Sequence, residues 1–150
     1  MTEAVSRPPR ILGVDVGGVR TGLALSDPLR ITCRPLTVLV ERDEGRLIEK
    51  ILRIAEAEDV GEIVIGLPRP LGGGSNAHLR GVERFAAALA GRTSLPVKTW
   101  DERFTSKLAE RDRKDRTPAD AVAACHLLQS YLDASRNARA GRSADGEEGP

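Results

Sequence analysis

Short apolar runs alternate with segments of helical periodicity along most of the chain. Three apolar runs come first, and their short links predict three antiparallel neighbouring strands. Apolar residues at helical spacing then alternate with two more short runs. The order β-β-β-α-β-α-β-α predicts a five-stranded mixed sheet with helices on both faces. The expected strands span 11–16, 21–26, about 31–40, 62–66 and 97–100, and the last helix is expected from 118 to about 134.

The chain has 150 residues, which fits one domain with its own core. We expect this domain at residues 10–134. The first nine residues are predicted to be flexible, and residues 135–150, rich in glycine, alanine and charge, are predicted to form a disordered tail. No apolar run is long enough to span a membrane, and the N-terminus has no secretory pattern. We therefore expect a cytoplasmic protein.

Composition and charge restrict the function only weakly. The formal net charge is +1, so no strong basic footprint indicates a nucleic-acid partner. Cys33 and Cys125 lie far apart among apolar residues and form no CxxC pair. The favoured interpretation is two reduced, buried thiols, and the alternatives are a disulfide or a metal role.

Asp15 interrupts the first apolar strand. A buried carboxylate there is costly unless it is hydrogen-bonded, paired or bound to a metal. The alternative is that Asp15 caps the turn at Gly17 and Gly18. Asp101 and Glu102 follow the strand at 97–100, at the sheet edge where ligands usually bind. Both could instead belong to the solvated first turn of a helix.

Asp120 has the strongest local explanation. The run Thr117-Pro118-Ala119-Asp120 is typical of a helix start, in which Asp120 would be a capping residue. Asp120 also shares a helical face with apolar residues expected to face the sheet. Together with Asp15 and Glu102, it would supply the oxygen ligands that two Mg²⁺ or Mn²⁺ ions require for phosphodiester hydrolysis.

Four stretches then identify a resemblance: LGVDVGGVRTGLALSD (12–27), IVIGLP (63–68), DERFTS (101–106) and DAVAACHLLQSY (120–131). In this order they resemble the YqgF-type (RuvX-type) family of Holliday junction resolvases and pre-16S rRNA nucleases, which has an RNase H-like fold. The similarity spans roughly residues 10–134. The resemblance implies a metal-dependent nuclease with Asp15, Glu102 and Asp120 as catalytic carboxylates and Asp101 as a further candidate metal ligand. One departure is the short connection 107–119, which puts the substrate geometry in doubt.

Several other residues are candidates for contact with nucleic acid near this site. The alternative for the arginines is an ordinary solvated side chain or a surface ion pair. Aromatic residues make up only 3% of the chain, so recognition is expected to rest on phosphates and shape. The lone histidines, His78 and His126, are interpreted mainly as packing residues. The candidate substrate-binding residues are Arg20, Arg69, Ser75, Asn76, Arg103 and Ser106.

The expected function is cleavage of structured nucleic acid, with maturation of the 5′ end of pre-16S rRNA as the first hypothesis. Resolution of Holliday junctions is the alternative, and symmetric cleavage would require a homodimer. Association with the ribosome would accompany the rRNA role. Two other classes remain open. An ATP-binding module of the actin and sugar-kinase type also begins with a strand ending in Asp-x-Gly, and a nucleic-acid-binding module could lack catalysis.

Overall fold

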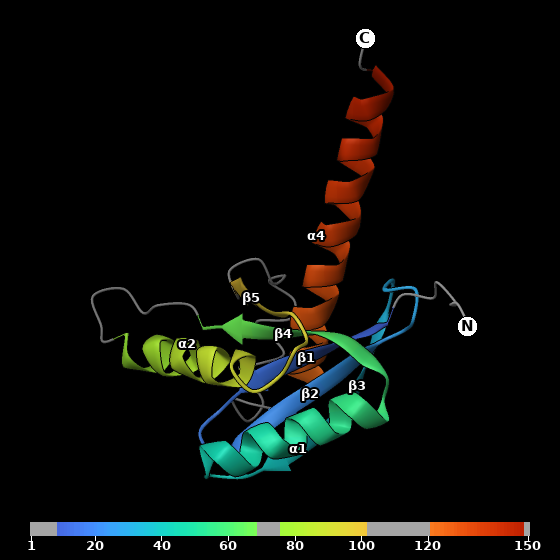
Figure 1. Ribbon diagram of the computed structural model, residues 1–150. Coiled ribbons are helices and arrows are strands. Elements are labelled where there is room, and N and C mark those ends of the chain that lie inside the picture. Colours follow the sequence, from blue (N-terminus) through green and yellow to red (C-terminus); the bar gives the residue numbers. More distant parts are fainter. Residues whose placement is uncertain (1–8, 69–75, 102–120, 149–150) are drawn as a thin grey trace.

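The computed structural model describes residues 9–68, 76–101 and 121–148, with side chains in the last range described as far as residue 140. The predicted order of strands and helices is confirmed (Figure 1). The elements are β1 (Arg10–Val16), β2 (Arg20–Ser26), β3 (Cys33–Val40), α1 (Glu44–Ala57), β4 (Val60–Leu67), α2 (Ala77–Ala90), β5 (Val97–Asp101) and α4 (Ala121–Glu148).

The five strands form one mixed sheet in the order β3-β2-β1-β4-β5. β1, β2 and β3 pair antiparallel, whereas β4 lies parallel to both β1 and β5. This follows from the connections, because short links join antiparallel strands and helical crossovers join parallel ones. β1 therefore occupies the centre of the sheet, where backbone pairing on both sides holds it in place.

Helices cover both faces of the sheet, as predicted. Alternate residues of β1 separate the two layers, so that Leu12 and Val14 face α1 and α2 while Ile11 faces α4. The apolar stripes of α1 and α2 are buried against the first face. α4 covers the second face with a smaller group of buried residues: Ala124, Leu128 and Leu132.

α4 approaches the sheet very closely because glycines face it. A Cβ atom at Gly13 of β1 would lie 2.9 Å from Cβ of Leu128 and 3.3 Å from the carbonyl oxygen of Ala124. Nearer the amino end of β1, Ile11 lines the same pocket as Leu132 of α4. α4 therefore runs antiparallel to β1, and its first turn points toward the carboxyl end of that strand.

Two predicted boundaries differ from the structure. The third strand begins at Cys33 rather than near Ile31, because Oδ1 of Asp27 accepts the backbone N–H groups of Ile31 and Thr32 and holds them in a turn. The last helix does not end near 134 but continues to Glu148, through the expected disordered tail. Alanine and arginine, both good helix formers, are frequent there, and their propensity outweighs the missing apolar periodicity.

The predicted start of the last helix at Pro118 lies outside the described residues, as does almost all of the segment 1–9 that was expected to be flexible. Within the part of the chain that the structure describes, no helix combines the length and apolar character needed to cross a membrane.

Candidate active site

Asp15 lies inside the sheet, as the second-last residue of β1. It pairs with Gly22 of β2, and its side chain is only 5% exposed. Strand alternation places it on the same face as Gly13, the face covered by α4. The structure therefore buries this carboxylate within the sheet, as the sequence led us to expect.

The start of α4 is directed toward the end of β1 that carries Asp15. Leu132 lines a pocket together with Ile11, whereas Leu128 and Ala124 meet Gly13, so earlier residues of α4 lie over later residues of β1. The N-terminal end of a helix carries partial positive charge from its backbone N–H groups, which favours anions nearby.

Asp101 ends β5 at the same edge of the sheet but on the other face. Its neighbour Trp100 pairs with Gly66 and packs against α4. Asp101 pairs with Leu67, which belongs to the opposite, α1 and α2 side of the core. Because successive strand residues alternate, Asp101 and Asp15 share an edge but point to different layers. The half-buried Asp101 is therefore less well placed to share a metal ion with Asp15 than a residue on the strand face of Trp100 would be.

Two of the candidate substrate-binding residues are described. Arg20 is exposed at the start of β2, and alternation places it on the same face as Gly22 and Asp15. Asn76 is exposed and begins α2 without a capping hydrogen bond from its side chain. Other predicted site residues lie outside the described residues: Glu102, Asp120, Arg69, Ser75, Arg103 and Ser106.

The described residues therefore include only some of the expected metal ligands. Within residues 9–68, 76–101 and 121–140, no three His, Cys, Asp or Glu side chains gather closely enough to hold a metal ion. Of the proposed ligands, the described residues contain Asp15 and Asp101. A buried carboxylate oxygen at the end of a central strand is a donor that suits a hard divalent ion such as Mg²⁺ or Mn²⁺. The described donor chemistry fits the expected metal.

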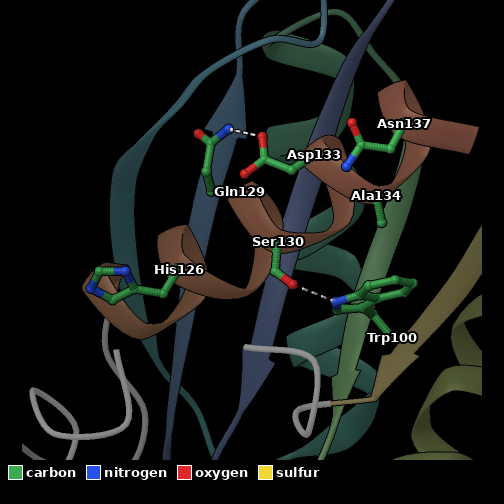
Figure 2. A pocket seen from close by; sticks show the side chains of 7 residues that line it. All are labelled: Trp100, His126, Gln129, Ser130, Asp133, Ala134 and Asn137. Atoms are coloured by element: carbon green, nitrogen blue, oxygen red, sulfur yellow. Dashed lines mark hydrogen bonds between the residues drawn. The ribbon is translucent and has the colours of Figure 1, made fainter. Parts of the chain in front are cut away.

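A pocket of about 580 Å³ lies between α4 and β5, lined on one side by Trp100 (Figure 2). Nε1 of Trp100 donates to Oγ of Ser130 at 3.0 Å, and its ring meets Tyr131 edge-on at a centroid distance of 5.4 Å. His126 also lines this pocket. Trp100 is half-buried and forms a wall that fixes α4 beside β5.

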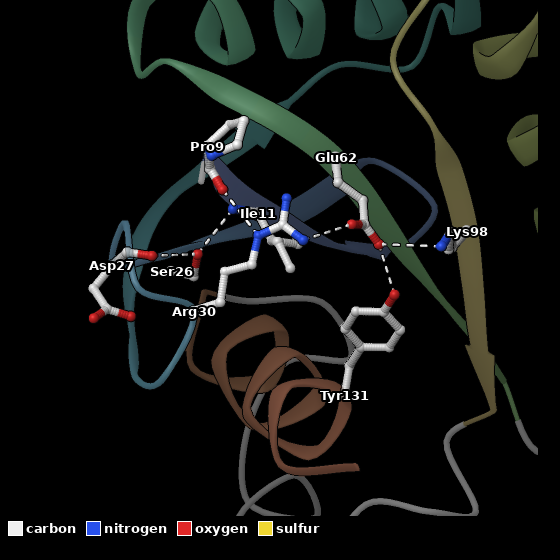
Figure 3. A network of polar contacts seen from close by, with 8 residues as sticks. All are labelled: Pro9, Ile11, Ser26, Asp27, Arg30, Glu62, Lys98 and Tyr131. Carbon is white, nitrogen blue, oxygen red and sulfur yellow. Dashed lines mark hydrogen bonds and ion pairs between the residues drawn. The ribbon is translucent and has the colours of Figure 1, made fainter. Parts of the chain in front are cut away.

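A buried polar network at the other end of the sheet was missed by the sequence analysis. Glu62 of β4 is 6% exposed, and it forms ion pairs with Arg30 at 3.2 Å and Lys98 at 3.9 Å (Figure 3). Its Oε2 accepts the hydroxyl of Tyr131 at 2.6 Å. The signal was present in the sequence, since Glu62 is a charged residue at the start of the predicted apolar run 62–66. The network joins α4 to β4, β5 and the loop before β3.

The two cysteines, distant in sequence, are neighbours in space. Sγ of Cys33 lies 3.3 Å from Sγ of Cys125 and 3.2 Å from the carbonyl oxygen of Cys125. Both are free thiols, as favoured by the sequence, but each is half-buried rather than fully enclosed.

Comparison with known proteins identifies the family. A family model described as RuvX, Holliday junction resolvase, matches residues 9–134. A Lachnospira eligens protein named "Putative pre-16S rRNA nuclease" is 36% identical over 138 residues, covering 85% of this chain and 99% of its own. A protein of the same name from Protochlamydia amoebophila is 40% identical over 146 residues, covering 87% and 97%.

Among solved structures, Thermus thermophilus RuvC in complex with a Holliday junction substrate matches with a TM-score of 0.59 and 14% sequence identity. The match covers 85% of this chain and 95% of RuvC, and it confirms the predicted RNase H-like fold. The family match over residues 9–134, supported by relatives that align along nearly their whole length, shows that this chain belongs to the RuvX family.

Proposed function

We propose that this protein is a divalent-metal-dependent nuclease that hydrolyses phosphodiester bonds in structured nucleic acid, with pre-16S rRNA as its substrate. The observation that carries the proposal is the buried Asp15, near the carboxyl end of the central strand and on the sheet face that α4 covers. A carboxylate in that position is costly unless it is hydrogen-bonded, paired or bound to a metal. The names of the relatives support the substrate.

Asp15, Glu102 and Asp120 are the proposed catalytic carboxylates. Asp15 belongs to a strand paired on both sides, which gives a shared ligand a rigid base. Asp120 directly precedes Ala121 in the sequence. The N-terminal end of α4 is directed toward the carboxyl end of β1, where Asp15 lies. When bound, two Mg²⁺ or Mn²⁺ ions would activate water and stabilise the leaving oxygen.

Glu102 is the preferred ligand over Asp101. Asp101 lies on the strand face that points away from Asp15 and α4. The resemblance to the RuvX family implies that Glu102 has this role. Asp101 would then support the site through hydrogen bonds rather than bind the metal directly, as outer groups around metal sites commonly do.

Arginine and small polar side chains would hold the substrate backbone. Arg20 is exposed on the face of Asp15, where its guanidinium can pair with a phosphate. Asn76, at the start of α2, lies at an exposed helix N-terminus, which also attracts phosphate. We assign the same role to Arg69, Ser75, Arg103 and Ser106.

A second candidate function is resolution of Holliday junctions, which the description of the family favours. Paired symmetric cuts would require two active sites, and hence a homodimer. The rRNA role would instead bring the protein to the ribosome. Both functions place the protein in the cytoplasm.

Cleavage of both substrates by one preparation tests these proposals. Labelled pre-16S rRNA fragments and four-way DNA junctions are incubated with wild type, Asp15→Asn and Glu49→Gln, each with Mg²⁺, with Mn²⁺ and with a chelator. Glu49 is the matched control, because it is an exposed carboxylate on α1, in the opposite layer. We expect Asp15→Asn to cleave more than roughly 100-fold more slowly than wild type. This loss is larger than that usually caused by changing a residue that only supports the metal ligands.

Glu49→Gln should cleave like wild type. The proposed mechanism is wrong if Asp15→Asn, free of host nucleases, cleaves as fast as wild type with Mn²⁺. Cleavage of the junction alone, in symmetric pairs, would favour the resolvase function over rRNA processing.

A further inference from the structure

We propose that Cys33 and Cys125 form a reversible, peroxide-sensitive disulfide that ties α4 to the edge strand β3 and slows the nuclease when it forms. The effect on cleavage rests on the proposed function, whereas the thiol chemistry stands independently of it. The carrying observation is a contact of 3.3 Å between two sulfur atoms that are 92 residues apart in sequence.

The two thiols are held in position for this reaction. Cys33 is the first residue of β3, and Cys125 lies in the second turn of α4, the helix that packs over β2 and β3. Gln129, one turn after Cys125, accepts from Sγ of Cys33 at 3.6 Å and donates to the carbonyl oxygen of Ile31 at 2.8 Å. A sulfur–sulfur bond of about 2.05 Å needs the atoms to approach by little more than an ångström.

The two thiols also differ in reactivity. A hydrogen bond joins the two sulfur atoms, and it lowers the pKa of the Cys125 thiol while it raises the pKa of the Cys33 thiol. The thiolate is the nucleophile in reactions with peroxide, so Cys125 would react first. Both cysteines are half-buried, so a small oxidant can reach their sulfur atoms while the two side chains stay in place between α4 and β3.

Hydrogen peroxide, or an organic peroxide, supplies the oxidant. The Cys125 thiolate attacks one peroxide oxygen and breaks the O–O bond, giving a sulfenic acid and, after protonation of the leaving oxygen, water from hydrogen peroxide or an alcohol from an organic peroxide. The Cys33 sulfur then attacks the sulfenic sulfur, its proton leaves with the hydroxyl as water, and the disulfide forms. A dithiol reductant returns two electrons and two protons by thiol–disulfide exchange.

The consequence for the site follows from α4. Cys125 lies four residues after Ala121, on the stretch of helix that approaches Asp15. Drawing this turn toward β3 by about an ångström displaces the ligand expected just before Ala121. A misplacement of that size costs on the order of 100-fold in rate. The oxidised enzyme should therefore cleave roughly 10- to 100-fold more slowly.

The test compares wild type, Cys33→Ser and Cys125→Ser, treated with hydrogen peroxide that is removed before each measurement. Intact mass and thiol titration under denaturing conditions should show that wild type loses two thiols and about 2 Da, and that dithiothreitol restores both. Each single variant should form no internal disulfide. Closing so long a loop should raise the Tm of oxidised wild type on the order of 10 °C, with no such rise in the variants.

Retention of both thiols after peroxide, or covalent dimers on a non-reducing gel, would overturn the proposed internal bond. Equal cleavage rates for reduced and oxidised wild type would overturn its regulatory effect. If reduced wild type cleaves neither substrate, the proposed nuclease function fails, and mass, thiol count and Tm still decide whether the disulfide forms.

Discussion

Asp15 is a residue at which local and overall requirements conflict. Its strand is otherwise apolar, and the side chain is 5% exposed beneath α4. An apolar residue would fill that position at lower cost. Such conflicts are expected at functional sites, where stability is given up for chemistry.

The metal should restore part of that stability. With Mn²⁺ at about 100 times its dissociation constant, binding to the folded state adds about 2.7 kcal/mol, which corresponds to a Tm increase of roughly 5–10 °C. We expect this increase in wild type and in Glu49→Gln, and little or none in Asp15→Asn, as measured by calorimetry. An equal rise in all three proteins would mean that Asp15 holds no metal.

Tyr131 is the other residue whose chemistry the fold changes. Burial, followed by the hydrogen bond to Glu62, raises the pKa of its hydroxyl to about 12. It is the sole tyrosine of the chain, so the ultraviolet absorbance of the phenolate reports on it directly. We expect a titration midpoint near 12 in the folded protein.

This raised pKa has a consequence for stability at alkaline pH. The hydroxyl stays protonated in the folded protein above the value of about 10 at which it ionises when unfolded. Its contribution is therefore fully present below pH 10 and is lost as the pH rises toward 12. The Tm of wild type should fall more steeply across this interval than that of Tyr131→Phe, and parallel slopes would contradict the assignment.

At the scale of elements, the packing of α4 on the sheet depends on Gly13. A Cβ atom there would meet backbone and Cβ atoms of α4, which cannot move away as a flexible side chain can. Gly13→Ala should lower the free energy of unfolding by about 1–3 kcal/mol and displace α4 from Asp15.

The matched control for this change is Gly18→Ala. Gly18 lies in the turn after β1, and a Cβ atom there has no neighbour within 4 Å among the described residues. Urea unfolding measures both variants. A loss of stability for Gly18→Ala as large as that for Gly13→Ala would show that the effect is not specific to the α4 contact.

At the scale of the whole molecule, α4 is longer than the sheet it covers, and its C-terminal part projects away from the sheet (Figure 1). Leu132 is still buried, whereas Arg136 to Ala140 are exposed. Most of the stabilising contacts of this helix are therefore made before residue 136.

Deletion of residues 141–150 should leave the fold intact. We expect the free energy of unfolding to change by no more than about 0.5 kcal/mol, because the last buried residue of α4 in the described part of the chain is Leu132. Truncation after Gln129 is the contrasting case, since it removes Tyr131 and Leu132 and should prevent stable folding. Thermal unfolding compares the two, and a large loss of stability for the shorter deletion would show that the projecting helix is held by the domain.

The sequence by itself determined the order of the elements and the faces they bury, because periodicities of two and of 3.6 residues are local properties. It also marked Asp15, since a carboxylate inside an apolar run is visible without any tertiary contact. The Glu62 charge was equally visible but was overlooked within the run at 62–66.

Only the tertiary structure decided which distant residues meet. Pairing register put Asp15 and Asp101 on opposite faces, and the path of α4 brought Cys125 to Cys33 and Tyr131 to Glu62. These features depend on how the sheet and α4 pack across almost the whole chain, and no local window of sequence contains that information.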